Sequence, residues 1–261
     1  MIPKSEIIAW SKKAPWNNNY MVEQDLIIER ALIEIYSSPN LCELLAFRGG
    51  TALHKLYFEP QPRYSEDIDL VQRNPGTIGD ILTLLRERLA FLGNASYERV
   101  THGNKLIYRF STEYEPVVKL RLKIEINTRE HFNIFDYQEI EREYIGEWFS
   151  GKVKIVTFTV EELLGTKLRA LYQRSKGRDL FDIWYATEKM QLDIKKLLHS
   201  FHKYLENENI SISKKDFISN LEEKIINSEF TGDIVGLLRP GIKYDTQEAW
   251  KSVKSILIDK I

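Results

Sequence analysis

The sequence predicts an α+β protein, with a mixed β-sheet flanked by helices and a helical C-terminal portion. Strand patterns dominate the first part of the chain, whereas helical periodicity runs almost unbroken from Thr159 to the end. Of the 261 residues, 43% are apolar and 29% are charged, as in a globular protein with a sizeable core. We therefore expect two domains, an α/β core with an N-terminal helix over residues 1–158 and a helical domain over residues 159–261 that completes the cleft.

The elements of the first domain follow from periodicity and from turn residues. Apolar positions at helical spacing predict helices over residues 21–36, 51–58 and 77–93. Runs rich in β-branched and aromatic residues predict strands over residues 66–72, 95–101, 105–111, 116–127 and 153–158. The tripeptide His102-Gly103-Asn104 predicts a hairpin turn between the second and third of these strands.

The strand over residues 116–127 has the clearest alternation in the chain. Its apolar face consists of Val118, Leu120, Leu122, Ile124 and Ile126. Its polar face consists of Lys119, Arg121, Lys123, Glu125 and Asn127. Because successive side chains of a strand point to opposite faces, the polar face has to meet solvent or a cleft.

The second domain opens with the helix-capping sequence Thr159-Val160-Glu161-Glu162. From there the pattern is helical, with breaks near Gly177, at residues 207–209 and at Pro240-Gly241. On the first of these helices one apolar stripe is expected to face the core, consisting of Val160, Leu163, Leu164, Leu168 and Leu171.

Bulk properties exclude several classes of protein. The net charge of −1 excludes a generally basic nucleic-acid coat, so any contact with nucleic acid has to come from local patches. The single cysteine, Cys42, excludes an internal disulfide and a cysteine-based zinc site. No segment approaches the roughly 18 apolar residues of a membrane span, and the N-terminus lacks the apolar run of a targeting segment. We therefore expect a cytoplasmic protein without a membrane partner.

Asp67 and Asp69 are the first candidate functional residues, since both lie in the predicted strand 66–72 and share one face. Two unpaired carboxylates this close repel each other, and the pKa of at least one rises. A divalent cation removes the conflict, because Mg²⁺ prefers oxygen ligands and commonly takes one or two carboxylates together with substrate phosphates. The ordinary alternative is that the two aspartates pair with Arg63 and Arg73 at an edge of the sheet.

Glu125 and a glycine pair extend this pattern. If the strand over residues 116–127 lies beside the strand with the aspartates, Glu125 completes a group of three carboxylates. Gly49-Gly50 follows a short apolar run and precedes a helix, where backbone N–H groups can bind a phosphate. The ordinary alternative for the glycines is a turn that requires a positive φ. The combination of these features indicates a metal-dependent nucleotide site.

These residues resemble the nucleotidyltransferase superfamily, whose pattern is hG[GS], then Dh[DE]h, then a third carboxylate on a later strand. The matching segments here are Phe47-Arg48-Gly49-Gly50, Asp67-Ile68-Asp69-Leu70 and Glu125. The stretches GGTALHKLY and RYSEDIDL resemble one branch in particular, the AbiEii/AbiGii toxin family, which is related to the mycobacterial MenT toxins. The K…R…RDhxD element of that branch is matched by Lys167, Arg174 and residues 178–182, so the resemblance covers roughly residues 45–185.

The resemblance implies a nucleotidyltransferase-like sheet and transfer of a nucleotide from an NTP with Mg²⁺ or Mn²⁺. MenT relatives add nucleotides to the 3′ end of tRNA, which makes RNA the expected acceptor. AbiEii members are toxins of toxin–antitoxin systems that act in phage abortive infection, so an antitoxin protein is an expected partner. The implied metal-binding or catalytic residues are Asp67, Asp69 and Glu125, and the implied triphosphate-binding residues are Gly49, Gly50 and Thr51.

Lys167 lies inside the apolar stripe of its helix. Its ammonium either reaches water past the edge of the helix or neutralises NTP phosphates, and the nearby Arg174 favours the second interpretation. Asp182 is expected in a buried first turn, where it needs a cationic partner and would position Lys167 or help to polarise the acceptor. Asp179 is the expected N-cap of that helix, and Arg169 is expected at the solvated surface.

The identity of the nucleotide and of the acceptor does not follow from these patterns. Cations that would bind an RNA backbone, or would simply be solvated, are Lys119, Arg121, Lys123, Lys176 and Arg178. One rival function is a catalytically silent nucleotide-binding module that acts through a protein partner. The other is a D-x-D glycosyltransferase, which would require a longer nucleotide-binding fold before Asp67 than this chain has.

Overall fold

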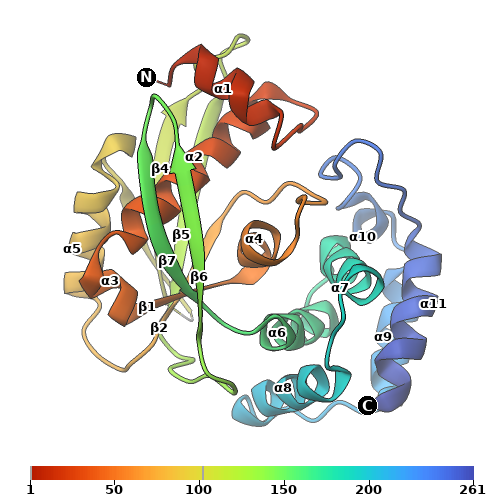
Figure 1. Ribbon diagram of the computed structural model, residues 1–261. Coiled ribbons are helices and arrows are strands. Elements are labelled where there is room, and N and C mark those ends of the chain that lie inside the picture. Colours follow the sequence, from red (N-terminus) through yellow and green to blue (C-terminus); the bar gives the residue numbers. More distant parts are fainter. Residues whose placement is uncertain (1, 102) are drawn as a thin grey trace. The chain divides into compact units, whose positions relative to one another are not determined.

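The computed structural model describes residues 2–101 and 103–261, and the chain forms two compact units, Met1–Phe158 (unit 1) and Thr159–Ile261 (unit 2) (Figure 1). Unit 1 contains a mixed sheet whose seven strands, as far as these residues show, have the order β3-β4-β5-β2-β1-β7-β6. The strands are β1 (Leu45–Arg48), β2 (Ile68–Gln72), β3 (Ser96–Val100), β4 (Gly103–Ser111), β5 (Lys119–Asn127), β6 (Gln138–Ile145) and β7 (Ser150–Thr157). Two neighbouring pairs are parallel, β1 with β7 and β2 with β5, and the others are antiparallel.

The helices of unit 1 are α1 (Lys4–Ser11), α2 (Asn19–Tyr36), α3 (Pro39–Leu44), α4 (Gly49–Ala52), α5 (Gly79–Arg88) and the 3₁₀-helix η2 (Ala90–Leu92). The chain continues from α4 into a π-helical turn, η1 (Leu53–Tyr57). The long helix α2 runs across the sheet, and its Tyr36 hydroxyl donates to the carbonyl oxygen of Val156 in β7 (Figure 1). Leu26, Ile28 and Leu32 of α2 are completely buried, so this helix forms much of the core of unit 1.

Most of the predicted elements of unit 1 are confirmed, and several details differ. Asp67 lies just before β2 rather than inside the strand. The strand β6 was not predicted, because its sequence QEIEREYI is largely polar and its side chains are mostly exposed at the edge of the sheet. Helices α1 and α3 and strand β1 were also not predicted. The hairpin between β3 and β4 is present, although His102 itself lies outside the described residues.

Unit 2 is helical, as predicted. Its helices are α6 (Val160–Gln173), α7 (Gly177–Lys189), α8 (Ile194–Asn207), α9 (Lys214–Lys224), α10 (Ser228–Gly232), α11 (Thr246–Ile256) and the 3₁₀-helix η3 (Ile258–Lys260). The Thr159 hydroxyl caps α6 by accepting from the backbone N–H of Glu162. The predicted breaks at Gly177 and after Asn207 are confirmed as the start of α7 and the end of α8. The apolar stripe of α6 is buried, apart from the half-buried Val160 at its start.

No helix within residues 2–101 and 103–261 combines the length and the apolar character needed to cross a membrane.

Candidate active site

The register of the sheet brings two of the predicted carboxylates together. β2 and β5 are parallel neighbours, and Asp69 pairs with Glu125. Residues paired across neighbouring strands point to the same face of a sheet, so the predicted adjacency of these two strands is confirmed. Asp67 stands two residues before Asp69, at the entry to β2. Unit 1 therefore gathers its predicted acidic residues at the first part of β2 and the adjoining part of β5.

Two of these carboxylates are paired with lysine. The Nζ atom of Lys123 lies 2.7 Å from Oδ2 of Asp67, and the Nζ atom of Lys105 lies 2.6 Å from Oε1 of Glu125. Lys105 is the cross-strand partner of Glu125 between β4 and β5. Its hydrogen bond to Glu125 is the main reason why the pKa of Lys105 is raised, so this lysine is charged at neutral pH. Both ion pairs are open to solvent, with between 19% and 41% of each side chain exposed.

The alternative pairing with arginine is not observed for Asp67, whose ion-pair partner is Lys123. Arg73 donates instead to the backbone carbonyl oxygens of Cys42 and Glu43. Arg63 is buried and donates to the carbonyl oxygen of Tyr64. The two arginines thus hold backbone segments in place.

The residues at this face fit a divalent cation held by carboxylate oxygens. Oδ1 of Asp67 is buried and has no hydrogen-bond partner, so an acceptor atom is left over beside Asp69. Carboxylate oxygens are the hard ligands that Mg²⁺ and Mn²⁺ prefer. Among the described residues, no three His, Cys, Asp or Glu side chains lie close enough together to share one ion. Asp67 and Asp69 are therefore the two residues that could hold the cation, whereas Glu125 is paired with Lys105.

Gly49 is required by its contact with Asp69. Its φ is +80°, a left-handed conformation that non-glycine residues rarely adopt. A Cβ atom at this position would lie 2.1 Å from Oδ2 of Asp69, well inside van der Waals contact. The glycine therefore lets the backbone at the start of α4 approach the Asp69 carboxylate directly, and Gly50 continues the helix from there.

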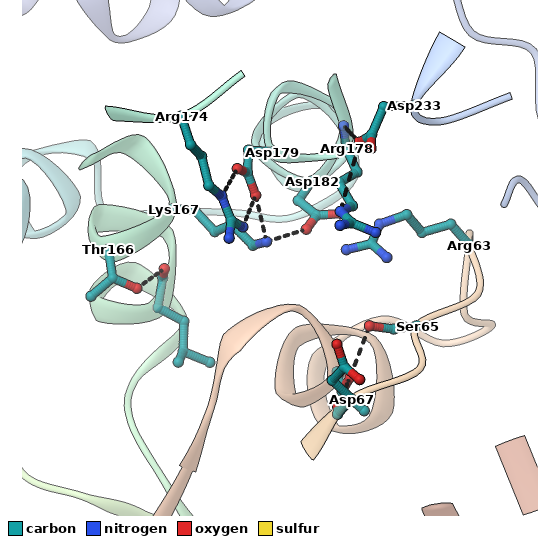
Figure 2. Close-up of polar contacts among 12 residues, drawn as sticks. Arg63, Ser65, Asp67, Thr166, Lys167, Arg174, Arg178, Asp179, Asp182 and Asp233 are labelled. Carbon is teal, nitrogen blue, oxygen red and sulfur yellow. Dashed lines mark hydrogen bonds and ion pairs between the residues drawn. The ribbon is translucent and has the colours of Figure 1, made fainter. Parts of the chain in front are cut away.

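Thr51 connects the same helix to Asp67. Its buried hydroxyl donates to the backbone carbonyl oxygen of Asp67 and lies 2.8 Å from the Ser65 hydroxyl. Figure 2 shows Ser65 and Asp67 on one loop, joined to this helix by a dashed contact. The side chain of Thr51 fixes the backbone that presents Asp67, and its role in triphosphate binding stays a prediction.

In unit 2, Lys167 is held between two buried aspartates (Figure 2). Its Nζ atom lies 2.8 Å from Oδ1 of Asp179 and 3.0 Å from Oδ2 of Asp182, and both carboxylates are fully buried. Arg174, the residue directly after α6, donates from Nε and Nη2 to the two oxygens of Asp179, at 2.7 and 2.9 Å. Lys167 is therefore an anchored internal cation, and the interpretation that its ammonium reaches water past the helix edge is wrong.

The environment of Asp179 explains how two carboxylates can be buried here. Burial raises the pKa of Asp179, but attraction to Lys167 and then to Arg174 outweighs burial, and the pKa lies below its ordinary value. The prediction that Asp179 caps α7 is wrong. The N-cap is Lys176, and Asp179 is the third helical residue, whose side chain turns to the cations instead of the helix end.

Three other cations of unit 2 are also paired. The prediction that Arg169 is solvated surface is wrong, since it is buried and its guanidinium lies 2.8 Å from Glu208. Lys176 and Arg178 share Asp233, at 3.5 and 3.6 Å. The shared aspartate, visible beside Arg178 in Figure 2, reduces the positive charge available for an RNA backbone.

A further buried ion network in unit 1 was not foreseen. Lys55 of η1 contacts Asp25 at 2.8 Å and Glu29 at 3.2 Å, and all three side chains are buried. Trp10 donates its indole N–H to the same Asp25 oxygen. A sequence signal existed, because Asp25 and Glu29 are four residues apart in a strongly apolar helix. The network ties α1, α2 and the helix that follows Gly49 to one another.

Comparison with known proteins identifies the family of the chain and proteins of similar fold. The model of one protein family, described as nucleotidyl transferase AbiEii toxin of type IV toxin–antitoxin systems, matches residues 30–252. MenT4, a nucleotidyltransferase toxin from Mycobacterium tuberculosis, has a similar fold, with a TM-score of 0.69 and 13% identity over 100% of this chain and 91% of that chain. JHP933 from Helicobacter pylori is similar with a TM-score of 0.57 and 16% identity over 92% and 90% of the two chains. No curated protein sequence matches the chain.

The family match covers most of the chain, and the structural likenesses support the same mixed sheet with C-terminal helices. This protein therefore belongs to the AbiEii family of nucleotidyltransferase toxins of type IV toxin–antitoxin systems.

Proposed function

We propose that this chain transfers a nucleotidyl group from an NTP to a hydroxyl group of an RNA acceptor, and that this transfer is its toxic activity. In such a transfer the acceptor oxygen bonds to the α-phosphorus while the bond from that phosphorus to pyrophosphate breaks. The register that places Asp69 opposite Glu125, with Gly49 packed against Asp69, is the observation that supports this proposal most directly. These carboxylates lie where the family pattern requires acidic residues.

In the proposed reaction, Asp67 and Asp69 are the residues that would hold Mg²⁺ or Mn²⁺. Such an ion would neutralise the triphosphate and lower the pKa of the acceptor hydroxyl. Thr51 holds the backbone of Asp67 in position, and Gly49 leaves room for the Asp69 carboxylate. Glu125 is the proposed acceptor of the hydroxyl proton. Its hydrogen bond with Lys105 is open to solvent and can exchange when substrates bind.

In unit 1, the backbone N–H groups at Gly49 and Gly50 are the proposed phosphate-binding groups. In unit 2, considered separately, Lys167 and Arg174 are the proposed cations that contact NTP phosphates. Lys167 is held by Asp179 and Asp182, so it can present its charge in one fixed position. Asp182 then acts as a positioning residue, because its carboxylate contacts Lys167. Arg174 is about half exposed, so part of its guanidinium remains accessible to a phosphate.

The test is a transfer assay. The purified full chain is incubated with Mg²⁺, total tRNA and each α-³²P-labelled NTP in turn, and the RNA is separated on a denaturing gel. We expect label in the RNA band with at least one NTP, and no label with the Asp69→Asn protein. Asparagine keeps the size of the side chain and removes its charge, so the comparison isolates the carboxylate.

The rival function gives a different result. A catalytically silent module would bind NTP in calorimetry but would leave every RNA unlabelled. Expression of its Asp69→Asn variant would still arrest growth. Label that appears on a protein instead of RNA would refute the proposed acceptor while leaving the nucleotidyl transfer in place.

A further inference from the structure

A groove of about 610 Å³ lies in unit 1, beyond the carboxylates. Its lining comes from α2, from the segment before β2, and from the facing ends of β4 and β5. The lining residues are Tyr20, Gln24, Glu66, Arg109, Phe110, Ser111, Lys119, Leu120 and Arg121.

The groove exists because β5 is longer than its neighbour. Pairing between β2 and β5 begins at Ile68 and Ile124, so residues 119–123 of β5 extend past the start of β2. The side-chain amide of Gln24 donates to the carbonyl oxygens of Glu66 and Arg121, at 3.1 Å each. This bridge satisfies backbone groups that a paired strand would otherwise satisfy, and it leaves the space open.

The charge of the groove is strongly one-sided. Arg109, Lys119 and Arg121 contribute three cations, and Glu66 is the one acidic residue of the lining. Arg109 and Arg121 are direct cross-strand partners, and like charges placed opposite each other destabilise a sheet. Over residues 2–101 and 103–261, none of these three cations has a carboxylate within ion-pair distance, unlike Lys105 and Lys123. The fold does not need this arrangement, whereas an anionic ligand would stabilise it.

The groove also offers one aromatic ring and a direct connection to the carboxylates. Tyr20 is half-buried, so one part of its side chain remains accessible for stacking. Glu66 directly precedes Asp67 in the chain. Arg121 shares its strand face with Lys123, the ion-pair partner of Asp67. Cations that track a backbone, together with rings that stack on bases, are the features that bind single-stranded nucleic acid.

We propose that this groove binds the single-stranded end of the polynucleotide acceptor and leads it to the carboxylates of unit 1. The inference rests on the proposed function for the acceptor, and it adds Arg109 and Tyr20 as contacts. Arg109, Lys119 and Arg121 share one face of the sheet and bind backbone phosphates, and Tyr20 stacks on a base. A strand of this kind is recognised through its charge and its bases, so many sequences are expected to bind.

The test measures binding separately from transfer. A fluorescein-labelled single-stranded RNA of about twelve nucleotides is titrated with the full chain in anisotropy experiments at several salt concentrations. The variant Lys119→Gln/Arg121→Gln removes two cations of the groove. The control Lys152→Gln/Lys154→Gln removes two cations of β7 that are 56% and 63% exposed. Both double variants change the net charge equally.

We expect the groove variant to bind the RNA at least about tenfold more weakly at low salt, and the control to bind like wild type. The slope of log K against log salt should become shallower by about 1.4, which corresponds to two lost phosphate contacts of about 0.7 each. Tyr20→Ala should weaken binding by about tenfold with an unchanged slope, because stacking releases no counterions. Affinity for NTP, measured by calorimetry, should not change in any of these variants.

Equal RNA binding by the groove variant and by wild type would overturn the groove assignment. If wild type and the groove variant label RNA equally well in the transfer assay, the proposed function is supported and the assignment of the groove as the RNA-binding site is refuted. If wild type transfers nucleotides to another kind of molecule and binds no single-stranded RNA, both assignments fail. Equal affinity for the corresponding DNA would support the groove and show that the 2′-hydroxyl is not recognised.

Discussion

The carboxylates of unit 1 and those of unit 2 are both paired with lysine, but in opposite surroundings. In unit 1 the side chains of Asp67 and Glu125 are 28% and 41% exposed, and each is paired with one lysine. In unit 2 the side chains of Asp179 and Asp182 are completely buried around Lys167. The same pair of residue types therefore appears once as an open site and once as a closed network.

This difference in burial decides whether each set of carboxylates is available to a ligand. A solvent-exposed ion pair is worth about 0–1 kcal/mol, so a metal ion or substrate can displace the lysines of unit 1 at little cost. Removing one partner of a buried pair costs about 3–5 kcal/mol, because the other charge is left without compensation. The acids of unit 1 are thus available to ligands, whereas those of unit 2 stabilise the fold and fix Lys167.

The largest expected effect is on stability, from Asp179→Ala. This change leaves Lys167 and Arg174 without their shared carboxylate, and we expect the free energy of unfolding to fall by about 3–5 kcal/mol. Urea denaturation followed by circular dichroism measures the change. The matched control is Glu141→Ala on the exposed side of β6, which should change stability by no more than about 0.5 kcal/mol. If Asp179→Ala lowers the free energy of unfolding by less than about 1 kcal/mol, the buried ion pairs of unit 2 do not stabilise the fold more than the open ion pairs of unit 1.

The pH dependence sharpens the same contrast. The pKa of Asp179 is lowered from its ordinary value of 3.8, so its contribution to stability is present above that value and is lost as the pH falls through the folded-state pKa. The stability difference between wild type and Asp179→Asn should therefore be constant near neutral pH and shrink below about pH 4. A difference that shrinks already between pH 8 and 6 would implicate another group.

The next effect is on activity, from Asp69→Ala. The half-buried carboxylates of unit 1 are expected to act on the substrate more than on the fold. We expect nucleotide transfer to fall by at least about a hundredfold, while the free energy of unfolding changes by less than about 1 kcal/mol. Growth arrest on expression should disappear together with transfer. Wild-type transfer by the Asp69→Ala protein would refute the assignment of the two aspartates.

A smaller effect is expected from Lys167, where stability and binding combine. Lys167→Ala should reduce NTP affinity at least tenfold, equivalent to about 1.5–3 kcal/mol for one charge-assisted contact. It should also lower the free energy of unfolding, because Asp179 and Asp182 lose their shared cation. Affinity is measured by calorimetry at a temperature at which the variant remains folded.

Lys167→Arg separates the two roles. The guanidinium keeps the charge between the aspartates, so stability should largely return. NTP affinity should recover poorly, since a guanidinium is wider and planar. Unchanged NTP affinity in Lys167→Ala would mean that this lysine only stabilises unit 2.

The smallest expected effect concerns Lys123, which competes with a cation for Asp67. Lys123→Gln should raise the affinity for Mn²⁺, measured by calorimetry without nucleotide, by up to about fivefold, since an exposed pair is worth at most about 1 kcal/mol. Lys152→Gln, which removes an exposed lysine of β7, is the control and should leave the metal affinity unchanged. Weaker Mn²⁺ binding in Lys123→Gln would show that the lysine assists the site instead of competing for it.

The sequence by itself determined the features that depend on local pattern. Alternation along residues 119–127 predicted an amphipathic strand with Glu125 on its polar face, and the structure has this strand. The glycine pair before a helical segment left two interpretations open, a phosphate-binding helix start and a turn with a positive φ, and Gly49 does have a positive φ. Helical periodicity predicted that Lys167 lies on the buried face of α6. Each of these follows from the spacing of residues a few positions apart.

Only the tertiary structure decided which charges meet. The pairing of Lys105 with Glu125 depends on the register of β4 against β5, and that of Lys123 with Asp67 joins residues 56 positions apart. Asp179 was predicted as a cap because its sequence position suits one, yet Lys167 within α6 and Arg174 directly after this helix are stronger partners. The cationic groove arises from the different lengths of β2 and β5. Ion pairs and grooves depend on distances between distant segments, and these distances are fixed by packing rather than by the pattern of neighbouring residues.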